Sequence, residues 1–321
     1  MRLTRFLLPL IASLSISAAH AQSFPSKTVT IVSPYQAGGT SDIIARILAQ
    51  KLSERWGQNV VIENRPGANG SIGVNQVVRA EPDGHTILAV ASSALTLNPI
   101  FYKNLSYNVE RDLAPISRTG SVANVLVVTP SVPATNLSAL MALAKEKPGQ
   151  MTYASQGTGS NGHLIGEQFA QRAGIEYRHI PYRGSAPAVQ DLLGGRVDMM
   201  FDNLPSALPQ IKAGNLRAIA VTTAQRSRLL PDVPTIAESV LPGFDAPAWF
   251  AVLVSKATPD NIKAELEKSV VAVLTAPDTK ERLQAAGVDV AAEGASELAR
   301  RIETETKIWR DVVAKAKIRI E

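Results

Sequence analysis

The strongest constraint on the fold of this 321-residue chain is one pattern that occurs twice, first after Val29 and again after Met151. Each copy predicts a short strand, a loop rich in Gly, Ser and Thr, and a helix. In the first copy these are 29–33, 34–42 and 43–52, and in the second they are 151–155, 156–162 and 163–169. Such a loop presents backbone N–H groups at the positive end of a helix dipole, which favours an anion. We therefore expect two similar lobes that hold one negatively charged ligand between them.

The parallel between the two halves continues beyond these loops. A strand, a loop and a helix follow at 60–63, 64–70 and 71–79, and again at 177–180, 181–184 and 185–193. A turn, a buried strand and a polar strand end come next, at 83–93 and 195–203. This alternation predicts an α/β fold in which each lobe has a mainly parallel sheet flanked by helices. Ligands of such sheets bind at the carboxyl ends of strands.

The lobe boundaries follow from the remaining apolar segments. Residues 122–128 predict one long apolar strand, which we expect to cross into the second lobe, and a further strand at 216–222 ends the second unit. The turn-rich segment 242–247 precedes the apolar stretch 250–254, where we expect the chain to return. The segment from Pro259 to the end predicts helices before and after one short strand at 288–291. The sequence thus predicts lobe 1 at 22–124 and 248–321, lobe 2 at 125–247, and a hinge between them.

The first residues have the features of a secretory signal peptide. Arg2 and Arg5 precede an apolar run at 6–16, and Ala19-His20-Ala21 forms a small-residue cleavage site. We expect cleavage after Ala21 and export to the periplasm. The chain has no cysteine, which excludes disulfides and a lipid-bearing cysteine.

The charge balance is mild. Two of the 33 basic residues lie in the signal peptide, so the net charge falls from +5 to +3 on cleavage. No cluster of Lys and Arg resembles a nucleic-acid-binding stripe, and we expect no nucleic-acid partner.

The segment from Gly157 to Gly162 matches the G-x-G-x-x-G pattern of dinucleotide sites. Those sites need an acidic residue at the end of the next strand, to bind the ribose. Here the next strand ends at His179-Ile180-Pro181, and the nearby Glu176 lies at its start. We therefore expect no nucleotide cofactor. The glycines serve either tight turns alone or an anion-binding loop.

The sequence gives little support to catalysis. It contains no G-x-S-x-G nucleophile elbow and no cysteine. After cleavage three histidines remain: His85 in a turn expected at the surface, His179 in a core strand, and His163, which either contacts the ligand or only packs. No spacing of His, Asp or Glu indicates a metal site.

Three charged residues each allow two interpretations. Asp42 either caps the helix that it begins or contacts the ligand. Asp202 follows a buried run and either orients loops or accepts from a ligand ammonium or hydroxyl. Arg183 either pairs with a ligand carboxylate or faces water.

Several segments together resemble the solute receptors of tripartite tricarboxylate transporters, the Bug-type periplasmic binding proteins. In the order of the chain they are P-Y-x-A-G-G-x-x-D at 34–42, V-I-E-N-R-P-G-A at 61–68, D-G-x-T at 83–86, Asn98-Pro99, G-x-G-S at 157–160, F-D-N-L-P at 201–205, A-G-x-L-R-A-x-A-V-T at 213–222 and P-D-V-P-T at 231–235. The resemblance covers the chain after residue 21. It implies a two-lobed Venus-flytrap fold of type II and a ligand that bears a carboxylate.

The resemblance also implies how the ligand is held. Loop N–H groups, hydroxyls and waters bind the carboxylate, rather than a conspicuous arginine. The predicted ligand-binding residues are Tyr35, Gln36, Gly38, Gly39, Thr40, Ser92, Ser93, Ser155, Gly157, Thr158, Gly159, Ser160, His163, Arg183 and Asp202.

The family implies a non-enzymatic receptor that captures a small organic carboxylate and delivers it to integral-membrane transporter subunits or to a sensor. We expect a monomer without a cofactor. The alternatives are a secreted α/β hydrolase and a ligand-sensing adaptor for a membrane sensor kinase.

Overall fold

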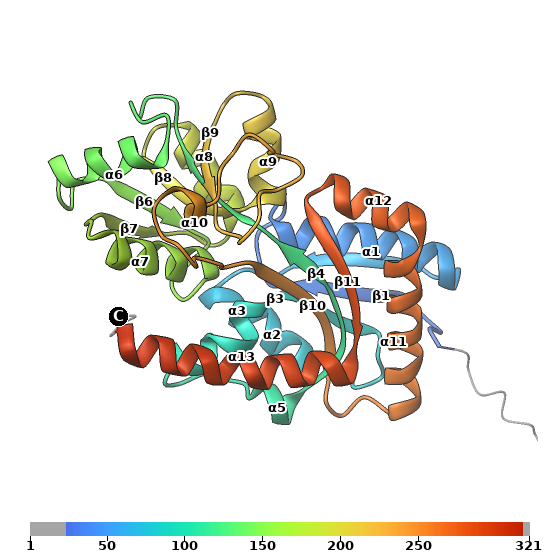
Figure 1. Cartoon of the computed structure of the whole chain (residues 1–321). Helices are drawn as coiled ribbons and strands as arrows, with labels where there is room; N and C mark the ends of the chain where they lie inside the picture. Colours follow the sequence, from blue (N-terminus) through green and yellow to red (C-terminus); the bar gives the residue numbers. More distant parts are fainter. Residues whose placement is uncertain (1–23, 317–321) are drawn as a thin grey trace, which may run out of the picture.

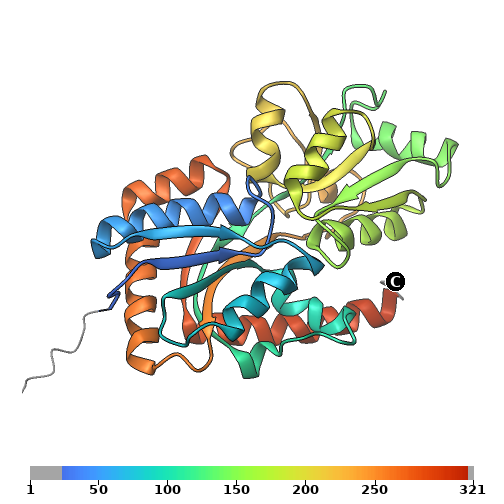
Figure 2. The ribbon, with the colours of Figure 1, turned by 180° about the vertical axis from the view of Figure 1, so that it is seen from behind.

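The computed structural model describes residues 24–316, so the predicted signal peptide at 1–21 lies outside the described residues. The chain forms two lobes, each built on one sheet with helices on both faces (Figures 1 and 2). The first sheet has the strand order β11-β4-β10-β3-β1-β2, and the second has the order β7-β6-β8-β5-β9. The predicted two-lobed α/β architecture is confirmed.

The strands of the first sheet come from both ends of the chain. They are β1 (Val29–Ser33), β2 (Val60–Asn64), β3 (Thr86–Ala91), β4 (Leu113–Val122), β10 (Ala248–Ser255) and β11 (Val288–Gly294). The second sheet contains β5 (Asn124–Val128), β6 (Thr152–Ser155), β7 (Arg178–Pro181), β8 (Met199–Asn203) and β9 (Arg217–Val221).

The two sheets are mixed, so the prediction of mainly parallel sheets is only partly right. The repeated units are parallel: β1 pairs with β2 and β3, and β6 pairs with β7 and β8. In contrast, β10 is antiparallel to β3 and β4, β11 to β4, and β5 to β8 and β9. Strands β5 and β10 follow the crossings between lobes, so each begins at the end of its sheet where the two lobes meet. They therefore run opposite to the parallel strands β8 and β3, which end there.

Four apolar clusters hold the helices onto the sheets. Helices α1 (Thr40–Trp56), α11 (Asp260–Thr275) and α12 (Pro277–Ala285) cover one face of the first sheet. Helices α2 (Ser71–Arg79), α3 (Ser92–Thr96) and α13 (Ala295–Ala316) cover the other. On the second sheet, α6 (Leu137–Glu146), α7 (Asn161–Ala173) and α10 (Ile236–Ser239) lie opposite α8 (Ser185–Leu193) and α9 (Leu204–Lys212).

Short helical turns connect the remaining elements of the first lobe: η1 (Ala68–Gly70), α4 (Asn98–Phe101) and α5 (Val109–Asp112). Within residues 24–316, no helix is both long and apolar enough to cross a bilayer.

The chain passes from one sheet to the other at Ala123, between β4 and β5. The prediction of a single strand over 122–128 is therefore wrong, because Val122 still pairs with β10 whereas Asn124 pairs with β8. The return segment lies beside this crossing: Asn124 donates from Nδ2 to the carbonyl of Ala246 (3.1 Å), and Ala246 donates its N–H to the carbonyl of Thr222 (2.9 Å). The two crossing segments are thus hydrogen-bonded to each other where the lobes join.

Candidate functional site

A cavity lies between the lobes and is lined by residues of both; its empty space, together with the solvent at its mouth, is about 400 Å³. Its walls come from the loops after β1, β3, β6, β7 and β8, together with η1 and β10. The lining residues are Tyr35, Gly39, Thr40, Ser41, Asn69, Ala91, Ser93, Gln156, Ser160, Asn161, Gly184, Ser185, Asn203 and Phe250. We call this space the inner cavity.

Three helices begin at the inner cavity. The first residues of α1 (Thr40 and Ser41), α7 (Asn161) and α8 (Ser185) all line it. No residue of 24–316 accepts a hydrogen bond from the backbone N–H groups of these four residues. Free N–H groups at the positive ends of helix dipoles form an anion-binding site.

The lining contains no Asp, Glu, Lys, Arg or His side chain. The charge preference of the inner cavity therefore comes from helix ends, amides and hydroxyls rather than from an ion pair.

A second cavity, with about 560 Å³ of empty space, adjoins the inner one and shares Tyr35, Asn69 and Gln156 with it. Its other walls include Tyr102, Gly157, Thr158 and the exposed Arg183. We call this space the outer cavity.

Hydrogen bonds join the lobes around both cavities. Tyr102 donates from its hydroxyl to the carbonyl of Thr158 (2.8 Å), and Asn161 donates from Nδ2 to Ser92 Oγ (3.2 Å). The hydroxyls of Thr40 and Ser206 share a third bond of 3.2 Å. The lobes are in a closed arrangement in this structure.

Asp42 holds the first glycine loop rather than facing the cavity. Its Oδ2 accepts from the N–H of Gly38 (2.9 Å) and from Arg46 Nε (2.8 Å), and its Oδ1 accepts from Asn64 Nδ2 (3.0 Å). Gly38 has a positive φ of 83°, which favours glycine, whereas Gly39 has a φ of −78°. The left-handed position of the first glycine loop is therefore Gly38 rather than Gly39.

Two stacked imidazoles lie under the second glycine loop. The rings of His163 and His179 are 4.0 Å apart and nearly parallel. His163 Nδ1 accepts from the N–H of Gly159 (3.1 Å), and His179 Nε2 shares a hydrogen bond of 2.6 Å with Ser155 Oγ. Burial lowers the pKa of His163, and burial with the neighbouring His163 lowers the pKa of His179 to about 3. Both rings are therefore neutral near pH 7, and they support the loop from behind.

His85, expected at the surface, is instead buried at 9% exposure. Its Nε2 accepts from the N–H of Ser26 (3.1 Å), and its ring packs against Phe24. The turn that contains His85 is covered by the residues before β1, which local sequence could not indicate.

Asp202 connects three segments of the second lobe. Its Oδ1 accepts from Gln156 Nε2 (2.8 Å), from Ser185 Oγ (2.6 Å) and from the N–H of Asn203 (2.9 Å). Burial raises the pKa of this carboxyl, and the hydrogen bonds from Ser185 and Gln156 partly offset the rise. Asp202 does not line the inner cavity, but each of its three partners does.

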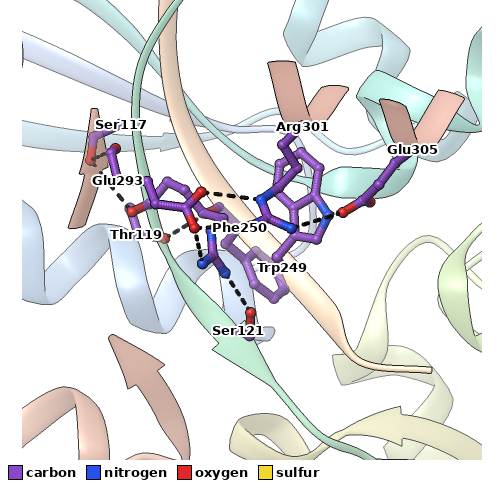
Figure 3. Close-up of polar contacts among 9 residues, drawn as sticks. Ser117, Thr119, Ser121, Trp249, Phe250, Glu293, Arg301 and Glu305 are labelled. Atoms are coloured by element: carbon purple, nitrogen blue, oxygen red, sulfur yellow. Dashed lines mark hydrogen bonds and ion pairs between the residues drawn. The ribbon is translucent and has the colours of Figure 1, made fainter. Parts of the chain in front are cut away.

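Phe250 closes the back of the inner cavity, and its strand is held by polar contacts that Figure 3 shows. Thr119 donates from Oγ1 to the carbonyl of Phe250 (3.0 Å). The neighbouring Trp249 donates from Nε1 to Glu305 Oε2 of α13 (2.6 Å). Arg301 of the same helix lies between Glu305 and Glu293. Helix α13 thereby fixes the strand that carries the cavity wall.

The structure divides the predicted site residues into three groups. Tyr35, Gly39, Thr40, Ser93 and Ser160 line the inner cavity. Gly157, Thr158 and Arg183 line the outer cavity. The others are not among the lining residues of either: Gln36, Gly38, Ser92, Ser155, Gly159, His163 and Asp202.

Sequence analysis missed several residues that line the inner cavity. The repeated unit indicated Gly184 and Ser185, because their loop corresponds to the loop after β2 in the first lobe. Asn69 lies in a loop of the repeated unit and Asn203 in one of the family-like segments, but neither side chain was predicted to bind the ligand. Phe250 carries no local signal, because only the return of β10 places it at the cavity.

The chain matches a family model described as tripartite tricarboxylate transporter family receptor over residues 44–318. It is 37% identical to protein BugT of Bordetella pertussis over 318 residues, which cover 98% of both chains. A solved structure of a Rhodopseudomonas palustris protein with adipate superimposes with a TM-score of 0.90 and 36% identity, covering 92% of this chain and 99% of the other.

A second solved structure, MatC from the same organism with bound malate, has a TM-score of 0.85 and 29% identity, and covers 90% of this chain and 100% of MatC. The match of the family model and the similarity to BugT both extend over most of the chain. The chain therefore belongs to the tripartite tricarboxylate transporter receptor family, the Bug-type periplasmic binding proteins.

Proposed function

We propose that this protein is a periplasmic receptor that captures a small carboxylate in the inner cavity and presents it to an integral-membrane transporter. The observation that carries the proposal is the convergence of three helix N-termini from two lobes on one cavity without charged side chains. The adipate and malate bound by two relatives support a carboxylate as the ligand class.

The expected energies are sufficient for binding without an ion pair. A helix N-terminus stabilises an anion by about 0.3–2 kcal/mol, and a hydrogen bond to a charged group contributes about 1.5–3 kcal/mol. Several such bonds offset the cost of association and leave about −8 kcal/mol, which corresponds to micromolar affinity.

The proposal includes closure of the lobes on the ligand. For the described residues we propose lobe 1 at 24–123 and 248–316 and lobe 2 at 124–247, one residue earlier than the boundary predicted from sequence because Asn124 already pairs with β8. We propose the hinge at the hydrogen-bonded crossing of Asn124 and Ala246. Contacts from both lobes favour the closed state, since a ligand shifts an equilibrium only by its differential affinity for the two states.

We also propose that the protein binds without chemistry. The Ser155–His179 pair is the arrangement closest to a nucleophile and base, but Ser155 is fully buried beneath the loop. Its hydroxyl also accepts from the N–H of Gly157 (3.2 Å). Sustained hydrolysis of chromogenic esters that is lost in Ser155→Ala would contradict this and favour the hydrolase alternative.

Native mass spectrometry of periplasmic protein tests the proposal by looking for a co-purified small acid. Calorimetry with a panel of carboxylates then measures the affinity. Ser160→Ala should weaken binding moderately, because it removes a cavity hydroxyl that also caps α7 by accepting from the N–H of His163 (3.3 Å). Arg183→Ala should matter less, because Arg183 is exposed at the outer cavity.

Loss of binding in Arg183→Ala, with normal binding after substitution of the loop glycines, would show instead that the site is a side-chain ion pair. A pull-down that recovers a sensor kinase rather than transporter subunits would favour the adaptor alternative.

A further inference from the structure

Asn69 stands out among the cavity residues because its backbone is strained. It lies in η1 with a φ of 45°, directly after Ala68 with a φ of 46°. Two consecutive non-glycine residues in the left-handed region are costly, and such strain clusters at ligand sites. Asn69 is only 8% exposed and lines both the inner and the outer cavity.

The orientation of the Asn69 amide follows from its neighbours. Asn98 donates from Nδ2 to the backbone carbonyl of Asn69 (3.1 Å), which can only accept. Asn98 also donates to the hydroxyl of Tyr107 (3.1 Å), whose own proton goes to the carbonyl of Ala94 (2.6 Å). The oxygen of Asn98 is thereby fixed, and it accepts from Asn69 Nδ2 (2.7 Å).

Asn69 Oδ1 is therefore left as an obligate acceptor. This oxygen is buried, and no residue of 24–316 donates to it. A buried acceptor without a donor costs about 1–3 kcal/mol, so a fixed orphan acceptor in a cavity wall points to a donor on the ligand. From the second lobe, the buried Oδ1 of Asn203 also lacks a donor in the described part of the chain and lines the same cavity.

We propose that Asn69 makes this receptor selective for hydroxy acids, carboxylates that bear a hydroxyl on a carbon next to the carboxylate. The helix N-termini hold the carboxylate, and Asn69 Oδ1 accepts from the hydroxyl. No carboxylate lines the inner cavity to balance the charge of an ammonium, since the buried Asp202 lies behind the lining residues Gln156, Ser185 and Asn203, and its Oδ2 has no donor among residues 24–316. This inference rests on the proposed function, and it narrows the class of carboxylate.

The test uses acids that differ at one substituent. Calorimetry on the intact mature protein compares succinate, malate and aspartate, then glutarate, 2-hydroxyglutarate and glutamate, then propionate, lactate and alanine. In the series that binds, the hydroxy acid should bind at least tenfold more tightly than the unsubstituted acid, since a site built around a hydroxyl rejects the analogue that lacks it. The wild-type comparison needs no variant.

Asn69→Gly then assigns the preference to this side chain. Glycine accepts the positive φ without strain, so the fold should persist, and circular dichroism checks it. The preference for the hydroxy acid should fall below threefold, mainly through weaker binding of the hydroxy acid. Ser160→Ala is the matched control, because it removes a cavity hydroxyl and should weaken both acids by a similar factor.

The outcomes distinguish a failure of the role of Asn69 from a failure of carboxylate capture. Equal or tighter binding of the unsubstituted acid, a preference for the amino acid, or an unchanged preference in Asn69→Gly would each overturn the role of Asn69 while carboxylate capture stands. Absence of binding by every acid of the panel would overturn carboxylate capture itself, and the selectivity with it.

Discussion

The hydroxyl of Tyr102 and the backbone carbonyl of Thr158 lie 2.8 Å apart, and their hydrogen bond joins the two lobes across the outer cavity. Tyr102 follows α4 in the first lobe, whereas Thr158 belongs to the glycine loop of the second. The bond can form only when the lobes are closed, so it favours the closed state.

We predict that Tyr102→Phe weakens ligand binding about threefold to tenfold, since a net hydrogen bond contributes about 0.5–1.5 kcal/mol. Small-angle scattering should show a larger radius of gyration for the free variant than for the free wild type. Tyr182→Phe is the control, because Tyr182 lines the same cavity but its hydroxyl donates to Asp191 Oδ2 within the second lobe (2.8 Å). Equal effects of the two variants would argue against a role of Tyr102 in closure.

The glycine loops should not tolerate a side chain. Gly159 has a φ of 78°, and its N–H is held by His163. Gly39 has an ordinary φ but lines the inner cavity. We predict that Gly159→Val and Gly39→Val each weaken binding at least tenfold, or about 1.4 kcal/mol, in calorimetry.

Gly174 provides the matched control for Gly159. It ends the same helix, has a φ of 62°, and has no atom within 4 Å of an added Cβ. Gly174→Val should therefore reproduce the backbone strain and leave affinity unchanged. A similar loss of affinity in both variants would mean that strain, rather than loop geometry, reduces binding.

The stacked histidines should make stability fall in mild acid. The pKa of His179 is about 3 in the folded protein and near 6.5 when unfolded, so the unfolded chain alone takes a proton between these values. The free energy of unfolding should therefore decrease as pH falls from about 6.5 toward 3. His179→Phe keeps an aromatic ring in the stack and should reduce this slope by up to about 1.4 kcal/mol per pH unit. An NMR titration that gives His179 a pKa near 6.5 would refute the argument.

Glu293 should stabilise the fold above its unfolded pKa. The hydrogen bond from Arg118 and, to a lesser extent, that from Arg301 lower the pKa of this carboxyl to about 2, although burial alone would raise it. Figure 3 shows Arg301 beside Glu293. Its contribution is present above about pH 4.5 and is lost as pH falls toward 2. We predict that Glu293→Gln lowers the free energy of unfolding at pH 7 by about 1–3 kcal/mol in urea titrations.

Two comparisons check this prediction. The difference between wild type and Glu293→Gln should shrink at pH 3. Glu303→Gln removes an exposed pair with Lys307 on α13 and should leave the free energy of unfolding nearly unchanged, because water and salt screen exposed pairs. An equal effect of the two substitutions would contradict a special contribution of Glu293.

The signal peptide is tested directly on the periplasmic fraction. Arg2, Arg5, the apolar run at 6–16 and Ala19-His20-Ala21 predict that the mature protein begins at Gln22. N-terminal sequencing should give this start. Recovery of the chain in the membrane fraction with Met1 intact would contradict export and cleavage.

Local pattern determined much of the architecture. The predicted helices at 71–79 and 185–193 coincide with α2 and α8, because each begins after a glycine loop and ends where its apolar periodicity ends. The repeated strand, loop and helix predicted two lobes and an anion site at strand ends. These features depend on side-chain periodicity and turn residues, which neighbouring positions encode.

Only the tertiary structure decided how the segments meet. Strand direction in β5 and β10 depends on where the chain crosses between lobes, and the break at Ala123 separates two sheets that no local pattern distinguishes. The third helix N-terminus at Ser185, the wall at Phe250 and the fixed amide of Asn69 reach the cavity through pairings with residues far away in sequence. Hydrogen bonds and packing between distant segments set these positions, so the sequence indicated a carboxylate site and the fold decided which atoms surround it.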